Sequence, residues 1–428
     1  MQINLIKNVT LIISVFIGIS ISQDIKSTIV LDDLIVEGIA NNPQLHAFYT
    51  KSQADLAKIP QAGSLPDPMI SLNILNLPTD NYVFDQEPMT GKQVAIKQKF
   101  PFPGKLGLKE QIAQKGADVS NANWQELKIQ LIRNIKSTYY DLYFVDEAIS
   151  TTEKNRELLV EFVNIAEQKY TVGKGVQQDV LKAQVELSKM LDRLINLKQK
   201  REKIEARLNA LLNRKINQPF GKTEKISYQE LKIDQETIEQ LILQKRPLFS
   251  AWQLRIEQND KKVALAKKQY WPDFSFFAAY SQRDVLQNGM GGADFLSAGI
   301  TLDIPLYFWR KQRKQVEEKQ LFRKSIEHSY GNIKLKTFSA LDNAITDLAK
   351  NDERLELYET GIIPQAAQSL QSAMIGYQTD KVDFLTLVNN QMTLFNLELE
   401  YERILSEYNK NIAELEYLAG GELPGSNN

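Results

Sequence analysis

Apolar residues recur at alternating steps of three and four along residues 176–212, with mostly polar and charged residues between them. Nine of the ten positions in this seam are apolar; the ten are Val180, Ala183, Leu187, Met190, Leu194, Leu197, Arg201, Ile204, Leu208 and Leu211. A seam with a mean period of 3.5 residues predicts a helix that packs lengthwise against another helix.

The same seam returns near the end of the chain. Eight of its ten positions are apolar; they are Leu387, Asn390, Leu394, Leu397, Tyr401, Ile404, Tyr408, Asn411, Leu415 and Leu418. Two such helices at corresponding places indicate that the chain contains an internal repeat.

A longer helical stretch precedes each seam. Residues 105–170 contain no proline and predict one helix, which at 1.5 Å per residue would reach ~100 Å. The second long helix, residues 311–377, contains Pro364, which we expect to kink or shift it. Short reversals at residues 170–175 and 377–383 connect the long helices to the seam helices.

Four short stretches alternate between apolar and polar residues, at residues 69–76, 93–100, 273–283 and 296–304. Phe276 and its apolar neighbours share one face of the third stretch, while Ser275 lies on the other face, which we expect to meet water. The polar faces include Lys97, Lys99 and Asp303. This alternation predicts two β-hairpins with one face suited to lipid and one to water.

Short motifs recur in the same order in both halves of the chain. Asp67 follows Leu65-Pro66 as Asp273 follows Trp271-Pro272, and Phe100-Pro101 corresponds to Ile304-Pro305. We therefore predict a first structural repeat at residues 23–213, a linker at 214–234, a second repeat at 235–421 and a disordered tail at 422–428. Each repeat comprises a helix, a β-hairpin and a long helical hairpin.

The N-terminus carries a basic residue, Lys7, followed by an apolar run at residues 9–21 and small residues at Ser20 and Ser22. This order is typical of a secretory signal peptide, which we place at residues 1–22, with an uncleaved anchor as the alternative. No other segment has 18 consecutive apolar residues, so any membrane segment of this chain would be made of strands.

Composition excludes several kinds of chemistry. The 428 residues carry a formal net charge of -1, which gives no electrostatic footprint for nucleic acid. There is no cysteine and there are only two histidines, so thiolate sites, cysteine nucleophiles and multi-histidine metal centres are not expected. Asp67 and Asp273 follow proline in turns, where aspartate commonly caps nearby N–H groups. We expect no catalytic residues, no metal site and no cofactor.

Four strands are too few to close a membrane barrel, for which about eight are the usual minimum. Three chains would supply about twelve. A soluble protein whose two small hairpins pack on helices is the alternative, although nothing in the chain would then cover the apolar face of Phe276.

The ordered set of motifs resembles the TolC-like outer-membrane efflux proteins over essentially the whole chain after the signal peptide. The motifs are QAGSLPDP at residues 61–68, FPFPGK at 100–105, YTVG at 170–173 and YQTD at 377–380, with Leu181, Leu385 and Gln391 after the reversals. The first two motifs look most like the heavy-metal (CzcC/CusC-type) branch.

This resemblance implies a mainly α fold with a membrane β-barrel, in which long α-helical coiled-coil hairpins accompany four β-strands per chain. A homotrimer would form a twelve-stranded barrel in the bacterial outer membrane, continued by a periplasmic α-helical barrel. Its implied function is that of an exit duct for the passive transport of small molecules or metal ions. The partners would be a periplasmic adaptor and an inner-membrane pump, of the RND type. A periplasmic coiled-coil adaptor or scaffold protein is the alternative.

The resemblance also implies roles for single residues. The adaptor would dock on a tip made of Tyr170, Thr171, Val172, Gly173, Tyr377, Thr379 and Asp380. A periplasmic gate would involve Asp179, Asp383, Thr386 and Asn389, and the barrel lumen would be lined by Lys97, Lys99 and Asp303. Asp380 replaces the family's glycine, so that turn should differ or be strained. Thr386 and Asn389 are uncharged where the family often carries aspartate.

Overall fold

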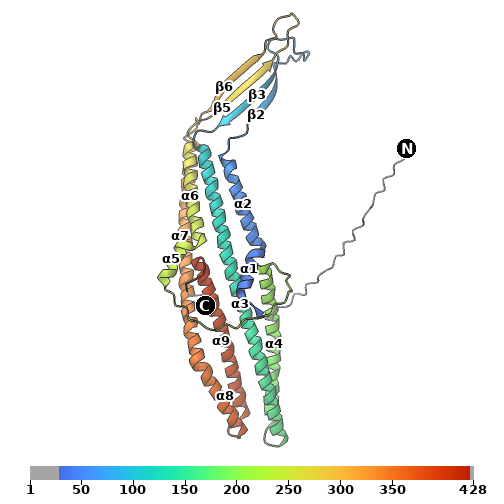
Figure 1. Ribbon diagram of the computed structural model, residues 1–428, viewed down its shortest axis with the longest axis vertical. Helices are drawn as coiled ribbons and strands as arrows, with labels where there is room; N and C mark the ends of the chain where they lie inside the picture. Colours follow the sequence, from blue (N-terminus) through green and yellow to red (C-terminus); the bar gives the residue numbers. More distant parts are fainter. Residues whose placement is uncertain (1–27, 425–428) are drawn as a thin grey trace, which may run out of the picture.

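The computed structural model describes residues 28–424, which form a long rod with a β-sheet at one end and two helical reversals at the other (Figure 1). The expected signal peptide at residues 1–22 lies outside the described residues.

The first half of the rod contains the expected helix, hairpin and long helical pair. Its elements are α1 (Leu31–Asn41), α2 (Pro43–Gly63), β2 (Met69–Leu75), β3 (Gly91–Phe100), α3 (Lys105–Thr171) and α4 (Gln177–Leu212). Asn42 separates α1 from α2 because its side chain accepts a hydrogen bond from the Leu45 N–H at 3.0 Å and caps the new helix. Pro43 follows as the first residue of α2, where its missing N–H costs nothing.

The second half repeats this order. Its elements are α5 (Gln235–Lys245), α6 (Pro247–Lys268), β5 (Asp273–Gln282), β6 (Phe295–Asp303), α7 (Gln312–Leu357), the π-helical turn η1 (Tyr358–Ile362), α8 (Ile363–Gln378) and α9 (Phe384–Ala419). Between the halves, β4 (Lys222–Thr223) pairs in parallel with β1 (Thr28–Ile29). The domain limits given above stay a prediction.

The π-helical turn lies where Pro364 interrupts the second long helix. Proline has no N–H to bond the carbonyl of Thr360, and the Ile363 N–H reaches back five residues to the Tyr358 carbonyl. The wider turn takes in one extra residue and the helix continues. The shift expected from Pro364 is thereby confirmed.

The sheet is antiparallel, in the order β2-β3-β5-β6. Ile96 on β3 faces Ile70 on β2 and Ala278 on β5. The even-numbered residues of the four strands thus form one continuous, mostly apolar face of the sheet. This face is bare: Leu72 and Leu296 are 78% and 82% exposed. The four strands end within one or two residues of the predicted limits.

The other face is less polar and less open than its sequence indicates. Ser275, expected to meet water, is only 4% exposed. It lies between Lys99 and Thr301 in the register of the sheet, and the Lys99 side chain reaches across β5 to Asp303 beside it. Phe277 also lies on this face, where its ring covers Gly299 so closely that an added Cβ would meet it at 2.4 Å.

The buried core runs along the helices in three clusters. Seam residues such as Met190 and Leu208 are buried as predicted. The charged seam position, Arg201, bonds the Asp146 carboxylate on α3 through its Nε at 2.7 Å, which explains how a charge fits there. No helix in the described part of the chain is both long and apolar enough to cross a lipid bilayer.

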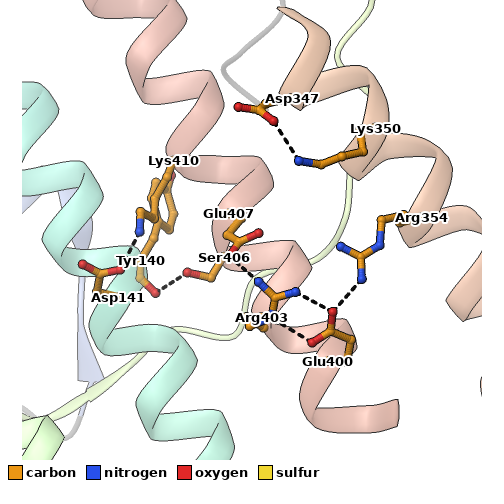
Figure 2. Close-up of polar contacts among 10 residues, drawn as sticks. All are labelled: Tyr140, Asp141, Asp347, Lys350, Arg354, Glu400, Arg403, Ser406, Glu407 and Lys410. Atoms are coloured by element: carbon orange, nitrogen blue, oxygen red, sulfur yellow. Dashed lines mark hydrogen bonds and ion pairs between the residues drawn. The ribbon is translucent and has the colours of Figure 1, made fainter. Parts of the chain in front are cut away.

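Polar contacts of α9 bind it to helices from both halves (Figure 2). Lys410 pairs with Asp141 on α3 at 2.7 Å, and the Ser406 hydroxyl donates to the Tyr140 carbonyl at 2.8 Å. On its other side, Glu400 accepts from Arg354 on α7. The two repeats are therefore held together by ion pairs as well as by apolar packing.

The described part of the C-terminal tail is packed, which corrects our expectation of disorder from residue 422. Gly420 adopts a left-handed conformation, φ +89°, and ends α9 by reversing the chain. Leu423 thereby reaches the cluster that contains Phe249 and Leu418, where it is buried. Residues 425–428 lie outside the described part.

Candidate functional site

The two reversals lie close together at the end of the rod opposite the sheet (Figure 1). At the first, Gly173 has φ +72°, and the N–H groups of Lys174 and Gly175 donate to the Lys169 carbonyl at 2.8 and 3.0 Å. This arrangement satisfies the last carbonyls of α3 and needs a left-handed residue, which glycine supplies without strain.

The second reversal has the same geometry, with Asp380 in the place of Gly173. Asp380 has φ +58°, and the N–H groups of Lys381 and Val382 donate to the Gly376 carbonyl at 2.8 and 3.2 Å. Without the family's glycine we expected this turn either to differ or to be strained. Its hydrogen bonds match those of the first reversal, so the turn does not differ. Aspartate instead takes the left-handed conformation, which costs most residues about 1–2 kcal/mol but which Asp and Asn adopt more readily.

Lys169 joins the two reversals. Its Nζ donates to the Asp380 carboxylate and to the Tyr377 carbonyl, both at 2.6 Å, and lies 4.1 Å from the centroid of the Tyr377 ring. The hydrogen bond from Lys169 lowers the pKa of the Asp380 carboxyl. Sequence reasoning missed Lys169, because this residue contacts a loop 211 positions away along the chain.

Tyr377 is the buried centre of this tip. It is 5% exposed and packs against Phe384 with ring centroids 5.4 Å apart. Among the described residues, no group accepts the hydrogen bond of its hydroxyl. Burial raises the pKa of the Tyr377 phenol, and the negative charges of Asp179 and Asp380 raise it further.

The predicted gate residues lie in different surroundings. Asp383 caps α9 by accepting a hydrogen bond from the Thr386 N–H at 2.7 Å, and hydrogen bonds from the Thr386 side chain and then from this N–H lower the pKa of Asp383. Asp179, in the first turn of α4, has its pKa raised by burial and then by the charge of Asp383. Thr386 and Asn389 are exposed on α9. The tip thus brings Asp179 and Asp383 together, but it gives Asp383 a structural role.

The remaining tip residues are open to solvent. Tyr170, Thr171, Val172 and Thr379 are all exposed around the two reversals. Above them, Gln391 on α9 donates to the Asn155 side chain on α3 at 2.7 Å inside the core. A buried hydrogen bond of this kind fixes the register between the helices that carry the tip.

The predicted lumen residues lie at the opposite end of the rod. Lys99 on β3 pairs with Asp303 on β6 at 2.7 Å, across β5, while Lys97 lies two residues further along the same face. The structure therefore brings two of the three together. Among residues 28–424, no group of three or more histidine, aspartate or glutamate side chains is placed to hold a metal ion.

The model for the outer membrane efflux protein family matches residues 34–214 and 238–421. A curated relative, Toxin and drug export protein A of Aggregatibacter actinomycetemcomitans, is 22% identical over 232 residues, or 53% of this chain. The chain spans about half the length of that relative, 48%.

Solved structures share the fold at low identity. The Campylobacter jejuni CmeC outer membrane channel is 15% identical with a TM-score of 0.78, over 100% of this chain and 96% of the channel. CusC is 13% identical with a TM-score of 0.79, over 91% of this chain and 92% of CusC. The family model spans both halves of the rod, and the chain belongs to the outer membrane efflux protein family.

Proposed function

We propose that this chain forms, as a homotrimer, the outer-membrane exit duct of a tripartite efflux system. The observation that carries the proposal is the separation of two surfaces along the rod. A sheet with a bare apolar face lies at one end, and the paired reversals lie at the other, beyond a helix of 67 residues that spans ~100 Å.

The apolar face of the sheet suits the hydrocarbon of the outer membrane. Four strands per chain would give twelve in a trimer, and closing them would leave no strand edge in lipid. Exposed aromatic residues at the base of the sheet, among them Trp271, Tyr307 and Trp309, suit the membrane interface. The long helices would then continue the duct into the periplasm.

The paired reversals suit contact with another protein. Tyr170 and Val172 are exposed apolar groups where α3 ends, and the ion pair of Lys169 joins one reversal to the other. We propose that a periplasmic adaptor docks here and couples the duct to an inner-membrane pump of the RND type. Asp179, Thr386 and Asn389 would line the periplasmic gate.

The transport is passive, and the family comprises efflux channels, which are not enzymes. Cargo would be small molecules or metal ions. The drug export named in one relative supports the first class, and the QAGSLPDP and FPFPGK motifs support heavy-metal export.

The test is to delete the gene in its own cell and measure the accumulation of ethidium and of copper and cadmium salts. We expect at least one of these probes to accumulate and the accumulation to be reversed by the wild-type gene. Cell fractionation of the complemented strain should place the protein in the outer membrane as a heat-modifiable trimer. A detergent-independent periplasmic monomer would instead favour an adaptor or scaffold.

A further inference from the structure

A buried ion pair fixes the junction between the sheet and the helices. The Asp273 carboxylate, at the start of β5, accepts from the Lys105 Nζ at 2.7 Å and from the Phe102 N–H at 3.0 Å. The Phe102 ring also stacks on Trp271 with centroids 5.0 Å apart. The start of α3 in the first half is thus clamped to the start of β5 in the second. We call this set of four residues the junction clamp.

The internal repeat supplies the residues for a second clamp. Asp67, just before β2, corresponds to Asp273, which begins β5. Lys311, just before α7, corresponds to Lys105, which begins α3, although the connection from Ile304 to Lys311 is two residues longer than that from Phe100 to Lys105. Both side chains are exposed, and neither makes an ion pair or hydrogen bond within residues 28–424. The second clamp therefore exists as two separate halves.

These halves lie at opposite edges of the sheet. Asp67 adjoins β2, which is one edge strand, and Lys311 follows β6, which is the other (Figure 1). In this antiparallel order β2 and β6 run in opposite directions, so β6 of one chain can pair in antiparallel fashion with β2 of another.

We propose that, where β6 meets β2 of a neighbouring copy in this barrel, the two strands pair in the register of β3 and β5, and Lys311 closes a clamp with Asp67 of that copy. The inference rests on the proposed trimeric duct and specifies how its subunits meet.

The repeat dictates the register. Ile96, four residues before Phe100, faces Ala278, five residues after Asp273. Ile304 corresponds to Phe100, and Ile300 lies four residues before it. Asp67 corresponds to Asp273, and Leu72 lies five residues after it. Ile300 should therefore face Leu72 of the neighbouring copy.

Two physical constraints favour this register. A slip by one residue would bring Thr301, from the polar face, opposite Leu72. A slip by two would preserve the faces but would move Lys311 ~7 Å along the strand from Asp67. The apolar face thus excludes shifts of the register by an odd number of residues, and the Lys311–Asp67 pair selects one register among the shifts by an even number.

Disulfide cross-linking tests the register, because the chain contains no cysteine. We expect the double variant Leu72→Cys with Ile300→Cys to form covalent dimers and trimers when outer membranes are oxidised, with no larger species. The matched controls Ile70→Cys and Ile74→Cys, each with Ile300→Cys, should not cross-link. Directly opposite residues lie ~5 Å apart, whereas diagonal ones lie ~7–8 Å apart, too far for a disulfide.

Stronger cross-linking of either control would overturn the register, and so would a lack of cross-linking in all three while export is normal. These results are distinct from failure of the proposed function, which would appear as unchanged accumulation of every probe when the gene is deleted.

Charge reversal tests the clamp. Asp67→Lys and Lys311→Asp should each lower the temperature at which the trimer dissociates in detergent, and the double variant should recover most of the loss. Arg310→Asp with Asp67→Lys is the matched control and should not recover it. Recovery by the Arg310 variant, or by neither, would show that Lys311 does not pair with Asp67.

Discussion

The Lys169 Nζ lies 2.6 Å from the Asp380 Oδ1, so one ion pair connects the two reversals at the tip of the rod. Asp380 also holds the left-handed conformation that Gly173 holds in the first reversal. A glycine at position 380 would serve the turn equally well. The aspartate adds a link between the two helical hairpins that the turn itself does not need.

Replacing Asp380 by Asn should loosen the tip while leaving the turn intact, because Asn adopts the left-handed conformation but carries no charge for Lys169. We expect spin labels at Thr171→Cys and Thr379→Cys to show a broader distance distribution in this variant. Lys381→Gln is the control, since Lys381 forms no ion pair among the described residues. An unchanged distribution in Asp380→Asn would mean that the remaining contacts, among them the Lys169 hydrogen bond to the Tyr377 carbonyl, hold the reversals together without the Asp380 charge.

Two aspartates should give the tip opposite responses to pH. The pKa of Asp380 is lowered by Lys169, so its stabilising contribution is complete above the ordinary value of about 3.9 and is lost as the pH falls through the lower folded value. The pKa of Asp179 is raised by burial and by Asp383, so its charge destabilises the tip, and protonation as the pH falls toward about 4 relieves that cost.

The same spin labels should therefore report a slight tightening of the tip as the pH falls from 7 toward about 4, and a loosening well below the ordinary aspartate pKa of about 3.9. Asp179→Asn should abolish the tightening and keep the loosening. A monotonic response in the wild-type protein would contradict this assignment.

The local architecture could be predicted from the sequence, and the tip contacts could not. Helix and strand limits follow from periods of 3.5 and 2 and from turn residues such as Pro43 and Gly420, which act on their immediate neighbours. The Lys169–Asp380 pair depends on where two helices about 200 residues apart end in space. The enclosure of Ser275 likewise depends on side chains from neighbouring strands, which an alternating pattern does not record.

Breaking the buried ion pair between the two halves should destabilise the trimer strongly. Lys136 on α3 and Glu416 on α9 lie 2.6 Å apart, with side chains 15% and 8% exposed. Lys136→Met would leave the Glu416 charge without this partner, at a cost of about 3–5 kcal/mol. Adding Glu416→Gln should restore most of the melting temperature. If the double variant is no more stable than the single one, the loss comes from lysine packing and not from charge.

Adjacent positions on β6 should differ in how well they tolerate arginine. Ile300 is on the bare apolar face, where arginine in a bilayer would cost about 2–4 kcal/mol at the midplane, whereas Thr301 is on the opposite face. We expect Ile300→Arg to lower the yield of trimer in outer membranes and Thr301→Arg to leave it nearly unchanged. Equal yields would mean that the apolar face does not meet lipid.

Substitution of Gly173 should separate docking from folding. A Cβ added at Gly173 meets no atom within 4 Å, so a side chain there would project beyond the chain. The positive φ disfavours most residues by about 1–2 kcal/mol, and Asn by less. We therefore expect Gly173→Asn and Gly173→Trp to keep normal trimer levels and to impair export, Trp more severely. Gly175→Ala is the control for a defect in the turn itself. Its Cβ would lie 3.1 Å from the Tyr170 nitrogen and should strain the turn. Normal export by both Gly173 variants would place adaptor docking elsewhere.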